Sequence, residues 1–243
     1  MNSNQKSICL DFGNTNLKVA YFENNQFIEQ CIVEDTIESM EDIIKRYKPA
    51  KSILSSVIDH NIEIEAVLKS KTNFHKLSHN SKLNFTTPVG SPSNIGADRI
   101  ALVEAGIALF PNTHLLIICL GTCITYNFVN IFKEFLGGGI SPGLGIRLKS
   151  LNDFTALLPL VKPTNEFPLI GYDTKTNILS GVILGIEHEL NGIIKNYLDK
   201  YAKINVILTG GDMLFFENRI KYKIFADQHL IFKGLNSINE KNN

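Results

Sequence analysis

The chain has 243 residues, of which 44% are hydrophobic and 20% are charged, and its 24 Lys and Arg side chains balance its 24 Asp and Glu side chains. This apolar fraction excludes a disordered chain, and the balanced charge argues against general binding to a nucleic-acid backbone. No apolar run approaches the roughly 18–20 residues that a membrane helix needs, and the polar start of the chain indicates no signal peptide. We therefore expect a cytoplasmic protein with no membrane and no nucleic-acid partner.

The first half of the chain predicts strands followed by helices. Residues 7–13 have the pattern of a buried strand that runs into a glycine turn, and residues 17–23 that of the returning strand of a hairpin. The spacing of Ile37, Met40 and Ile43 predicts a helix over residues 37–47. The other elements expected here are strands at 27–33, 52–57 and 74–77 and helices at 62–68 and 97–109.

The second half repeats this alternation. A strand–turn–strand is expected at 115–120 and 124–129, then a glycine run at 137–139 and a Ser-Pro-Gly turn at 141–143. Helices are expected at 145–154 and 174–201, and a strand at 205–208. Strands that alternate with helices and hairpins predict an α/β fold with mixed sheets. Because no flexible linker separates the halves, we expect two tightly packed lobes, at residues 1–112 and 113–243.

The turns of the two predicted hairpins share one pattern. Residues 8–15 (ICLDFGNT) align with residues 116–123 (LIICLGTC), each as a buried strand followed by a small glycine turn. Glycine permits close backbone approach, and the turn N–H groups, with the side chains of Asn14, Thr15 and Thr122, can donate hydrogen bonds to phosphate oxygens. Two such hairpins facing each other across a cleft would hold a nucleoside triphosphate. The alternative is that both are ordinary hairpins with Asn and Thr as common turn residues.

Five short motifs follow one another along the chain. They are DFGNTNLK at 11–18, GADR at 96–99, GGGISPG at 137–143, Thr174 with Gly181 seven residues later, and TGGD at 209–212. They resemble the motifs DxGNTxxK, GxDR, GGxIxPG, TxxxxxxG and TGGD of the type III pantothenate kinases, a family of the acetate and sugar kinase, Hsp70 and actin superfamily. Any one motif is weak evidence, but five in the family's order span nearly the whole chain.

The resemblance implies an activity and a set of partners. The activity is ATP-dependent phosphorylation of pantothenate, the first step of coenzyme A biosynthesis, in two ribonuclease-H-like lobes with mixed central sheets flanked by helices. The implied cofactors are ATP, Mg²⁺ and a monovalent cation, K⁺ or NH₄⁺, and the implied assembly is a homodimer. Two alternatives stay open: a catalytically weakened homologue that binds nucleotide or pantothenate as a regulatory or accessory protein, and a kinase for another small hydroxylated acid.

The resemblance also assigns roles to two aspartates. Asp98 matches the proton acceptor, since phosphoryl transfer to a primary alcohol asks for a carboxylate that accepts the hydroxyl proton. Asp98 also stands where an aspartate would cap a helix, and the two roles are compatible. Asp11 lies at a strand end beside a phosphate turn, which suits a magnesium ligand that acts directly or through water. Its alternative role is a capping aspartate.

The remaining site residues follow from the same motifs. The expected ATP-binding residues are Asp11, Gly13, Asn14, Thr15, Lys18, Gly121 and Thr122. The expected substrate-binding residues are Gly96, Ala97, Arg99 and Thr174. The guanidinium of Arg99 offers a planar fork that suits a substrate carboxylate. Thr174 resembles the residue that reaches the substrate from the partner subunit, and its alternative role is the N-cap of the long helix that follows.

The second hairpin departs from the family pattern. The family has DxGTAxT here, with an aspartate that resembles a ligand of the monovalent cation, whereas this chain has Cys119 at that position and Cys123 in place of the alanine. A neutral thiol is a poor ligand for K⁺ or NH₄⁺. We therefore expect one of three outcomes: either the cation site is rebuilt from carbonyl groups, or activity is independent of the cation, or activity is weak. Val89 also stands where the family tends to have a tyrosine. No second cysteine pair or histidine cluster completes a zinc site, so we interpret Cys119 and Cys123 as small buried residues. With no export signal in the sequence, we expect reduced thiols.

Overall fold

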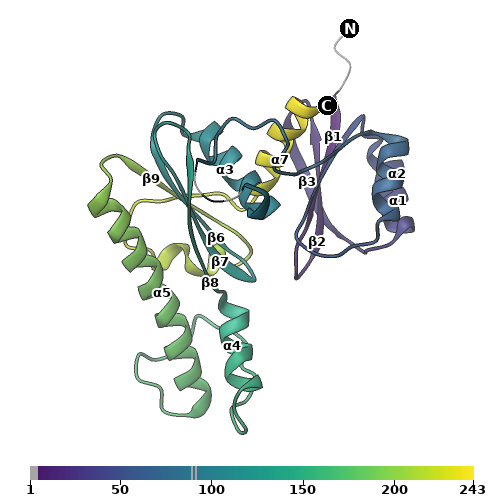
Figure 1. Cartoon of the computed structure of the whole chain (residues 1–243). Helices are drawn as coiled ribbons and strands as arrows, with labels where there is room; N and C mark the ends of the chain where they lie inside the picture. Colours follow the sequence, from purple (N-terminus) through teal and green to yellow (C-terminus); the bar gives the residue numbers. More distant parts are fainter. Residues whose placement is uncertain (1–4, 89, 91) are drawn as a thin grey trace. The chain divides into compact units, whose positions relative to one another are not determined.

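The computed structural model describes residues 5–88, 90 and 92–243, and its contacts divide the chain into two compact units (Figure 1). The first unit comprises Met1–Pro111, Lys133–Phe135 and His229–Asn243. The second unit comprises Asn112–Phe132 and Leu136–Gln228. By its contacts the C-terminal segment His229–Asn243 belongs to the first unit. The division into lobes of residues 1–112 and 113–243 stays a prediction.

The first unit is built on a mixed sheet of five strands. These are β1 (Lys6–Phe12), β2 (Leu17–Glu23), β3 (Gln26–Val33), β4 (Lys51–Ser56) and β5 (Asn73–Lys76). They lie in the order β3-β2-β1-β4-β5, with β1 antiparallel to β2 and parallel to β4. The helices of this unit are α1 (Ile37–Tyr47), α2 (Glu63–Lys71), α3 (Ala97–Leu109), α7 (Leu230–Asn242) and the short 3-10 helix η1 (Pro92–Asn94).

Helix α1 illustrates how local sequence sets the packing of this sheet. Its N-terminus is capped by Thr36, whose hydroxyl accepts a hydrogen bond from the backbone N–H of Ser39 at 3.2 Å. It ends at Tyr47 because Lys48 adopts the left-handed conformation, with φ of 49°. Its apolar stripe, which includes Met40 and Tyr47, is buried in one core with alternate residues of β1. The predicted bounds of this helix are confirmed.

Helix α7 packs against α3, β1 and β4, on the side of the sheet that α1 does not cover. Ser7 of β1 bonds from its hydroxyl to the side chain of Asn236 at 2.7 Å. Gly234 lies so close to α3 that a Cβ there would be less than 3.0 Å from the carbonyl oxygen of Ala101. The fully buried carboxylate of Glu104 on α3 accepts hydrogen bonds from Lys241 of α7 and from Asn84. These contacts fix the helix whose first turn carries Asp98.

The second unit has a sheet of the same design. Its strands are β6 (His114–Leu120), β7 (Cys123–Val129), β8 (Phe135–Pro142), β9 (Ile204–Thr209) and β10 (Phe225–Ala226), in the order β10-β9-β6-β7-β8. By its contacts, Phe135, the first residue of β8, belongs to the first unit. Its helices are α4 (Leu144–Asp153), α5 (Thr174–Lys200), α6 (Met213–Phe216) and the 3-10 helix η2 (Glu217–Arg219). Strand β6 is antiparallel to β7 and parallel to β9, as β1 is to β2 and β4. The predicted α/β fold with mixed sheets is therefore confirmed.

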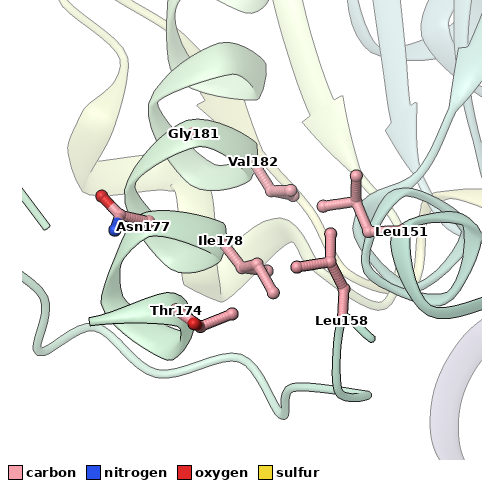
Figure 2. Close-up of a pocket in the computed structure, with 7 residues that line it drawn as sticks. All are labelled: Leu151, Leu158, Thr174, Asn177, Ile178, Gly181 and Val182. Carbon is pink, nitrogen blue, oxygen red and sulfur yellow. The ribbon is translucent and has the colours of Figure 1, made fainter. Parts of the chain in front are cut away.

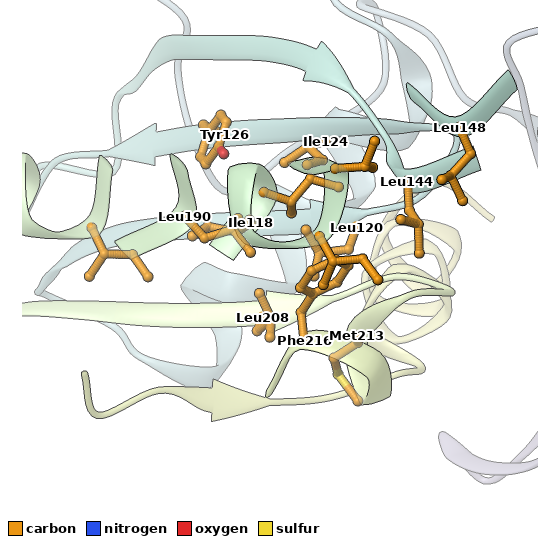
Figure 3. Close-up of a cluster of buried hydrophobic side chains, with 14 of the residues drawn as sticks. Ile118, Leu120, Ile124, Tyr126, Leu144, Leu148, Leu190, Leu208, Met213 and Phe216 are labelled. Atoms are coloured by element: carbon orange, nitrogen blue, oxygen red, sulfur yellow. The ribbon is translucent and has the colours of Figure 1, made fainter. Parts of the chain in front are cut away.

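A buried apolar cluster joins the sheet of the second unit to its helices (Figure 3). Ile118 and Leu120 of β6 and Ile124 of β7 contribute one side, and Leu144 and Leu148 of α4 pack with them.

The described part of the chain contains no helix that is both long and apolar enough to cross a membrane.

The glycine run lies within β8, between the predicted strand–turn–strand and the Ser-Pro-Gly turn. Gly138 has φ of 150°, and a Cβ there would be less than 3.0 Å from the carbonyl oxygen of Tyr126 on β7. A side chain at this position would therefore push β8 away from β7. The glycine run therefore lets β8 lie close to β7. Three consecutive glycines in a sequence do not by themselves predict such close strand pairing.

Candidate active site

The first of the two hairpins expected to bind phosphate, the first phosphate hairpin, is formed by β1, β2 and the turn between them. Asp11 and Lys18 are paired across the hairpin in the antiparallel register. The N–H of Gly13 donates to the carbonyl of Asn16 at 3.2 Å and closes the turn. The side chain of Asn14 is exposed at the tip, as is that of Thr15. The turn therefore presents polar groups outward from a rigid strand pair.

Asp98 lies in the first turn of α3 and folds back over the start of the helix. The N–H of Arg99 donates to the carbonyl of Gly96 at 3.0 Å, and a Cβ on Gly96 would lie 2.5 Å from Oδ1 of Asp98. The backbone amides of Asp98 and Arg99 lie beside the carboxylate. Burial raises the pKa of Asp98 above its ordinary value of 3.8, although these amides and the charge of Arg99 lower it. Ala97 is the first residue of the same helix.

Asp11 and Asp98 are close enough for their charges to interact. Burial raises the pKa of Asp11 to about 7, the charge of Asp98 adds to this increase, and Lys18 opposes it. Ser55 of β4 is the register neighbour of Asp11, so both side chains project to the same face of the sheet. The hydroxyl of Ser55 is buried and makes no hydrogen bond. Two carboxylates thus interact here, and an unsatisfied hydroxyl lies on the same face of the sheet as one of them.

This donor set fits a magnesium ion. All its atoms are oxygens, which hard cations prefer, and Mg²⁺ in kinase sites usually uses one or two carboxylates with waters and substrate phosphates. Among the described residues, no cluster of three His, Cys, Asp or Glu side chains could hold a metal by itself. The arrangement therefore suits an ion that the protein and a nucleotide hold together.

The guanidinium of Arg99 is held by an aromatic ring. Its central carbon lies 5.4 Å from the centroid of the Phe135 ring, an arrangement that a cation and an aromatic face favour. Phe135 is buried, and its N–H donates to the carbonyl of Thr86 at 2.8 Å. The fork of Arg99 is thus attached to the helix turn that carries Asp98 and is oriented by a fixed ring. The sequence did not predict a role for Phe135.

The second phosphate hairpin is formed by β6 and β7, and a second motif packs on its turn. Within the turn, the N–H of Gly121 donates to the carbonyl of Cys123 at 3.1 Å. The N–H of Gly143 donates to the carbonyl of Thr122 at 3.0 Å. A Cβ on Gly143 would lie less than 3.0 Å from the carbonyl oxygens of both Gly121 and Thr122. The Ser-Pro-Gly turn therefore needs glycine at its end to reach the hairpin.

The TGGD turn meets the same hairpin. The N–H of Asp212 donates to the carbonyl of Leu120 at 2.9 Å. Gly210 has φ of 102° and lies against Leu120, so that a Cβ there would be less than 3.0 Å from its carbonyl oxygen. Burial raises the pKa of Asp212. Three motifs that are far apart in the sequence are thus brought together at one turn of the second unit.

Cys119 lies on β6 between two threonines. Its register partners are Thr125 on β7 and Thr209 on β9. All four cysteines of the chain are described, and none forms a disulfide. Hydroxyl and thiol groups at these positions do not replace the carboxylate that the family motif has, so the residues on these three strands do not fit the expected monovalent-cation site.

Thr174 begins α5 and lines a pocket of about 580 Å³ within the second unit (Figure 2). Gly181, the other residue of its motif, lines the same pocket, opposite Leu151 and Leu158. The N-cap of α5 is Asp173, whose carboxylate accepts from the N–H of Thr176 at 2.7 Å. The capping alternative for Thr174 is therefore wrong. Val89 lies outside the described residues.

The chain is similar to known proteins over nearly its whole length. A family model described as type III pantothenate kinase matches residues 7–196. A type III pantothenate kinase of Christiangramia forsetii is 42% identical over 240 residues, which cover 97% of this chain and 98% of that protein. One of Bacteroides fragilis is 40% identical over 241 residues, which cover 98% of each chain.

Solved structures show the fold alone. A conserved putative Baf family transcriptional activator of Campylobacter jejuni has a TM-score of 0.58 at 24% identity, covering 97% of this chain and 98% of that one. A putative 2-dehydro-3-deoxygalactonokinase of Sinorhizobium meliloti has a TM-score of 0.55 at 11% identity, covering 96% and 97%. The matched family model and the two similar kinases show that this chain belongs to the type III pantothenate kinase family.

Proposed function

We propose that this protein is an ATP-dependent pantothenate kinase, which forms 4'-phosphopantothenate in the first step of coenzyme A biosynthesis. Membership of the family over nearly the whole chain supports this activity. The structural observation that carries the proposal is that Asp11 and Asp98, from two separate motifs, are close enough for their charges to interact, with Lys18 paired to Asp11 across the hairpin. Nothing in the family match favours a regulatory homologue without activity. A cytoplasmic location stays a prediction.

In the proposed reaction Asp98 accepts the proton of the pantothenate hydroxyl as its oxygen attacks the γ-phosphate. Burial raises the pKa of Asp98 above its ordinary value of 3.8, and the backbone amides at the start of α3 oppose this increase. A carboxylate with a raised pKa is a stronger proton acceptor. Asp11 would hold Mg²⁺ directly or through water, and the bound ion would neutralise charge on the phosphates. Lys18 lies beside Asp11 on the hairpin and would contact a phosphate as a point charge.

The remaining proposed contacts divide between nucleotide and substrate. The nucleotide would be bound by Asp11, Gly13, Asn14, Thr15, Lys18, Gly121 and Thr122. The substrate would be bound by Gly96, Ala97, Arg99 and Thr174. We assign the pantothenate carboxylate to Arg99, because its planar fork matches a carboxylate in two parallel hydrogen bonds.

A substrate panel tests this function. Purified protein is incubated with ATP, Mg²⁺ and pantothenate, pantetheine or other small hydroxylated acids, and the phosphorylated product is identified by mass spectrometry. We expect 4'-phosphopantothenate, with far lower turnover of the other acids. Turnover of a different hydroxy acid with none of pantothenate would contradict the assignment of the substrate.

We also propose a homodimer that pairs through the segment between α4 and α5, residues 154–173. This segment and the first half of α5 extend beyond the strands of the second unit (Figure 1). It exposes large apolar side chains: Phe154 at 87%, Leu157 at 92%, Leu160 at 62%, Leu169 at 77%, Ile170 at 83% and Tyr172 at 81%. So many exposed apolar groups in one segment are typical of a protein interface. Thr174 follows this segment directly, which would place it beside a partner subunit.

The assembly state tests the dimer. The double variant Leu157→Asp, Ile170→Asp is expected to sediment as a monomer and to lose activity if Thr174 serves the partner's site. Ile62→Asp is the matched control, because that side chain is 65% exposed in the first unit. A monomeric wild-type protein, or a double variant that remains dimeric, would contradict this interface.

A third proposal concerns the monovalent cation. Cys119 and its register partners lack the family's carboxylate, so we expect weaker activation by K⁺ or NH₄⁺ than in relatives that have it. Rates are measured in KCl and in choline chloride at equal ionic strength. Cys119→Asp is expected to increase the difference between the two salts. A steep K⁺ dependence of the wild-type enzyme would show that other ligands bind the cation.

A further inference from the structure

A hydrogen-bonded ion pair lies in the second unit outside every residue assigned above. Arg147, in the first half of α4, pairs with Glu189 of α5. The other carboxylate oxygen of Glu189 accepts from the hydroxyl of Tyr126 on β7 at 2.8 Å. Both charged side chains are only about one-fifth exposed, at 21% and 22%. The pair therefore joins two helices to the sheet at one point.

The guanidinium of Arg147 also holds the end of β8. Its Nε donates to the carbonyl of Pro142 at 2.8 Å, and its Nη2 donates to the hydroxyl of Ser141 at 2.9 Å. These are the two residues before Gly143, which packs on the carbonyls of the second phosphate hairpin. Arg147 is thus one residue removed from the contact that fixes the hairpin turn.

The charge state of the network suits this function. Burial alone would raise the pKa of Glu189, but its bonds with Arg147 and Tyr126 lower it below the ordinary value of 4.5. Burial and the carboxylate raise the pKa of Tyr126, which therefore stays a neutral donor. At neutral pH a carboxylate holds the guanidinium, and the guanidinium's remaining N–H groups are directed to β8.

We propose that Arg147 and Glu189 are positioning residues for the nucleotide, because they hold the Ser141–Gly143 turn against the second phosphate hairpin. This inference rests on the proposed function, in which Gly121 and Thr122 of that hairpin contact ATP. The amide of Gly143 reaches Thr122 at 3.0 Å, and a shift of the turn would move the hairpin groups that receive phosphate. Neither charged residue touches the nucleotide.

The packing of the helices does not depend on this pair alone. α4 is anchored in the core by Leu144 and Leu148, and α5 by Ile183, Ile186 and Leu190, all buried. The pair of Arg219 and Glu187 has nearly the same burial, so its loss measures what the removal of such an ion pair costs in stability. Loss of the pair should therefore change the position of the turn more than the stability of the fold.

The test uses a matched ion pair that joins the same helix, α5, to η2. Arg219 and Glu187 form a bond of 3.4 Å with side-chain exposures of 20% and 18%, and the structure gives that pair no bond to β8. Arg147→Lys keeps the charge but loses the fork, and Glu189→Gln keeps a hydrogen-bond acceptor but loses the charge. Glu187→Gln is the control. Each variant is assayed for the KM of ATP, the KM of pantothenate, kcat and the melting temperature.

We expect Arg147→Lys and Glu189→Gln to raise the KM of ATP about tenfold, as the loss of a charge-assisted hydrogen bond would. The KM of pantothenate should stay within about twofold, since Arg99 and Thr174 are untouched. The double variant should be no worse than the poorer single one, because the two residues act as a unit. Melting temperatures should fall no further than that of the control.

The inference is overturned if Arg147→Lys and Glu189→Gln leave the KM of ATP unchanged, or change the KM of ATP and the KM of pantothenate equally. It is also overturned if Glu187→Gln raises the KM of ATP as much as they do. Binding of a fluorescent ATP analogue separates this result from the proposed function. If wild-type protein binds the analogue but does not phosphorylate pantothenate, the proposed function is contradicted, and the dissociation constants of the variants still decide the inference. If wild-type protein does not bind the analogue, both fail.

Discussion

Substitution of one glycine, Gly143→Ala, would probe the packing at the second phosphate hairpin. The added Cβ would lie 2.5 Å from the carbonyl oxygen of Thr122 and closer still to that of Gly121. Both obstacles are backbone atoms, and real Cβ atoms essentially never approach within 3.0 Å. The turn and the hairpin must therefore separate by about 1 Å to restore ordinary contact distances.

The structure sets the size of this effect. Overpacking of a tight contact costs roughly 1–3 kcal/mol, and the backbone clash puts this variant at the upper end, about 2–3 kcal/mol. For a chain of this length we expect the melting temperature to fall by about 5–10 °C. Gly145→Ala, two residues along, is the control, because nothing lies within 4 Å of its Cβ. In helix α4 that change should stabilise the protein by up to about 1 kcal/mol.

Thermal unfolding followed by circular dichroism measures both variants, and steady-state assays give the KM of ATP. Gly143→Ala is expected to lower the melting temperature and to raise the KM of ATP. Gly145→Ala should raise the melting temperature slightly and leave the KM of ATP unchanged. If Gly143→Ala retains wild-type stability and ATP affinity, the close contact between the turn and the hairpin is refuted.

Two further predictions follow from the first unit. Gly96→Ala should lower kcat strongly with little loss of stability. Its Cβ would lie 2.5 Å from Oδ1 of Asp98, a side chain that can rotate away, and would otherwise make only ordinary contact with Val57, at 4.0 Å. Steady-state kinetics and a melting curve check this, and an unchanged kcat would count against the placement of Asp98. Glu65→Gln should destabilise the protein at pH 7 by about 1–3 kcal/mol, because buried Glu65 accepts from Lys76 at 2.7 Å. Burial raises the pKa of Glu65, but Lys76 and Lys69 lower it below 4.5, so this stabilisation is present above pH 4.5 and lost as the pH falls through the lowered pKa. Urea unfolding of the wild-type protein and of Glu65→Gln is measured from pH 7 to pH 3. The difference between their free energies of unfolding should shrink as the pH falls, and a constant difference would contradict the ion pair.

The elements that the sequence predicts well are those with local causes. The hairpins of β1–β2 and β6–β7 follow from strand alternation and a glycine turn, and α1 follows from its apolar stripe and cap. Helix α7 was missed, although Leu230, Leu235 and Ile238 have helical spacing that could have indicated it. Its packing on α3 was beyond prediction, because that depends on how the chain returns to the first unit.

The site was predictable as motifs and less so as geometry. Asp11 and Asp98 are singled out by their motifs, but their mutual effect on pKa depends on the packing of α3 over the sheet. The hydroxyl of Ser55 and the ring of Phe135 carry no sequence signal, because only tertiary contacts place them beside the motif residues. The network of Arg147 and Glu189 was missed for the same reason.

The role of Asp98 is the central claim, and the kcat of Asp98→Asn tests it most directly. Asparagine keeps the size of the side chain and its contact with the start of α3 but cannot accept the hydroxyl proton. We expect kcat for pantothenate phosphorylation to fall by about 10²–10⁴-fold, with the melting temperature and the KM of ATP close to those of the wild-type protein. Wild-type turnover in Asp98→Asn would contradict the account.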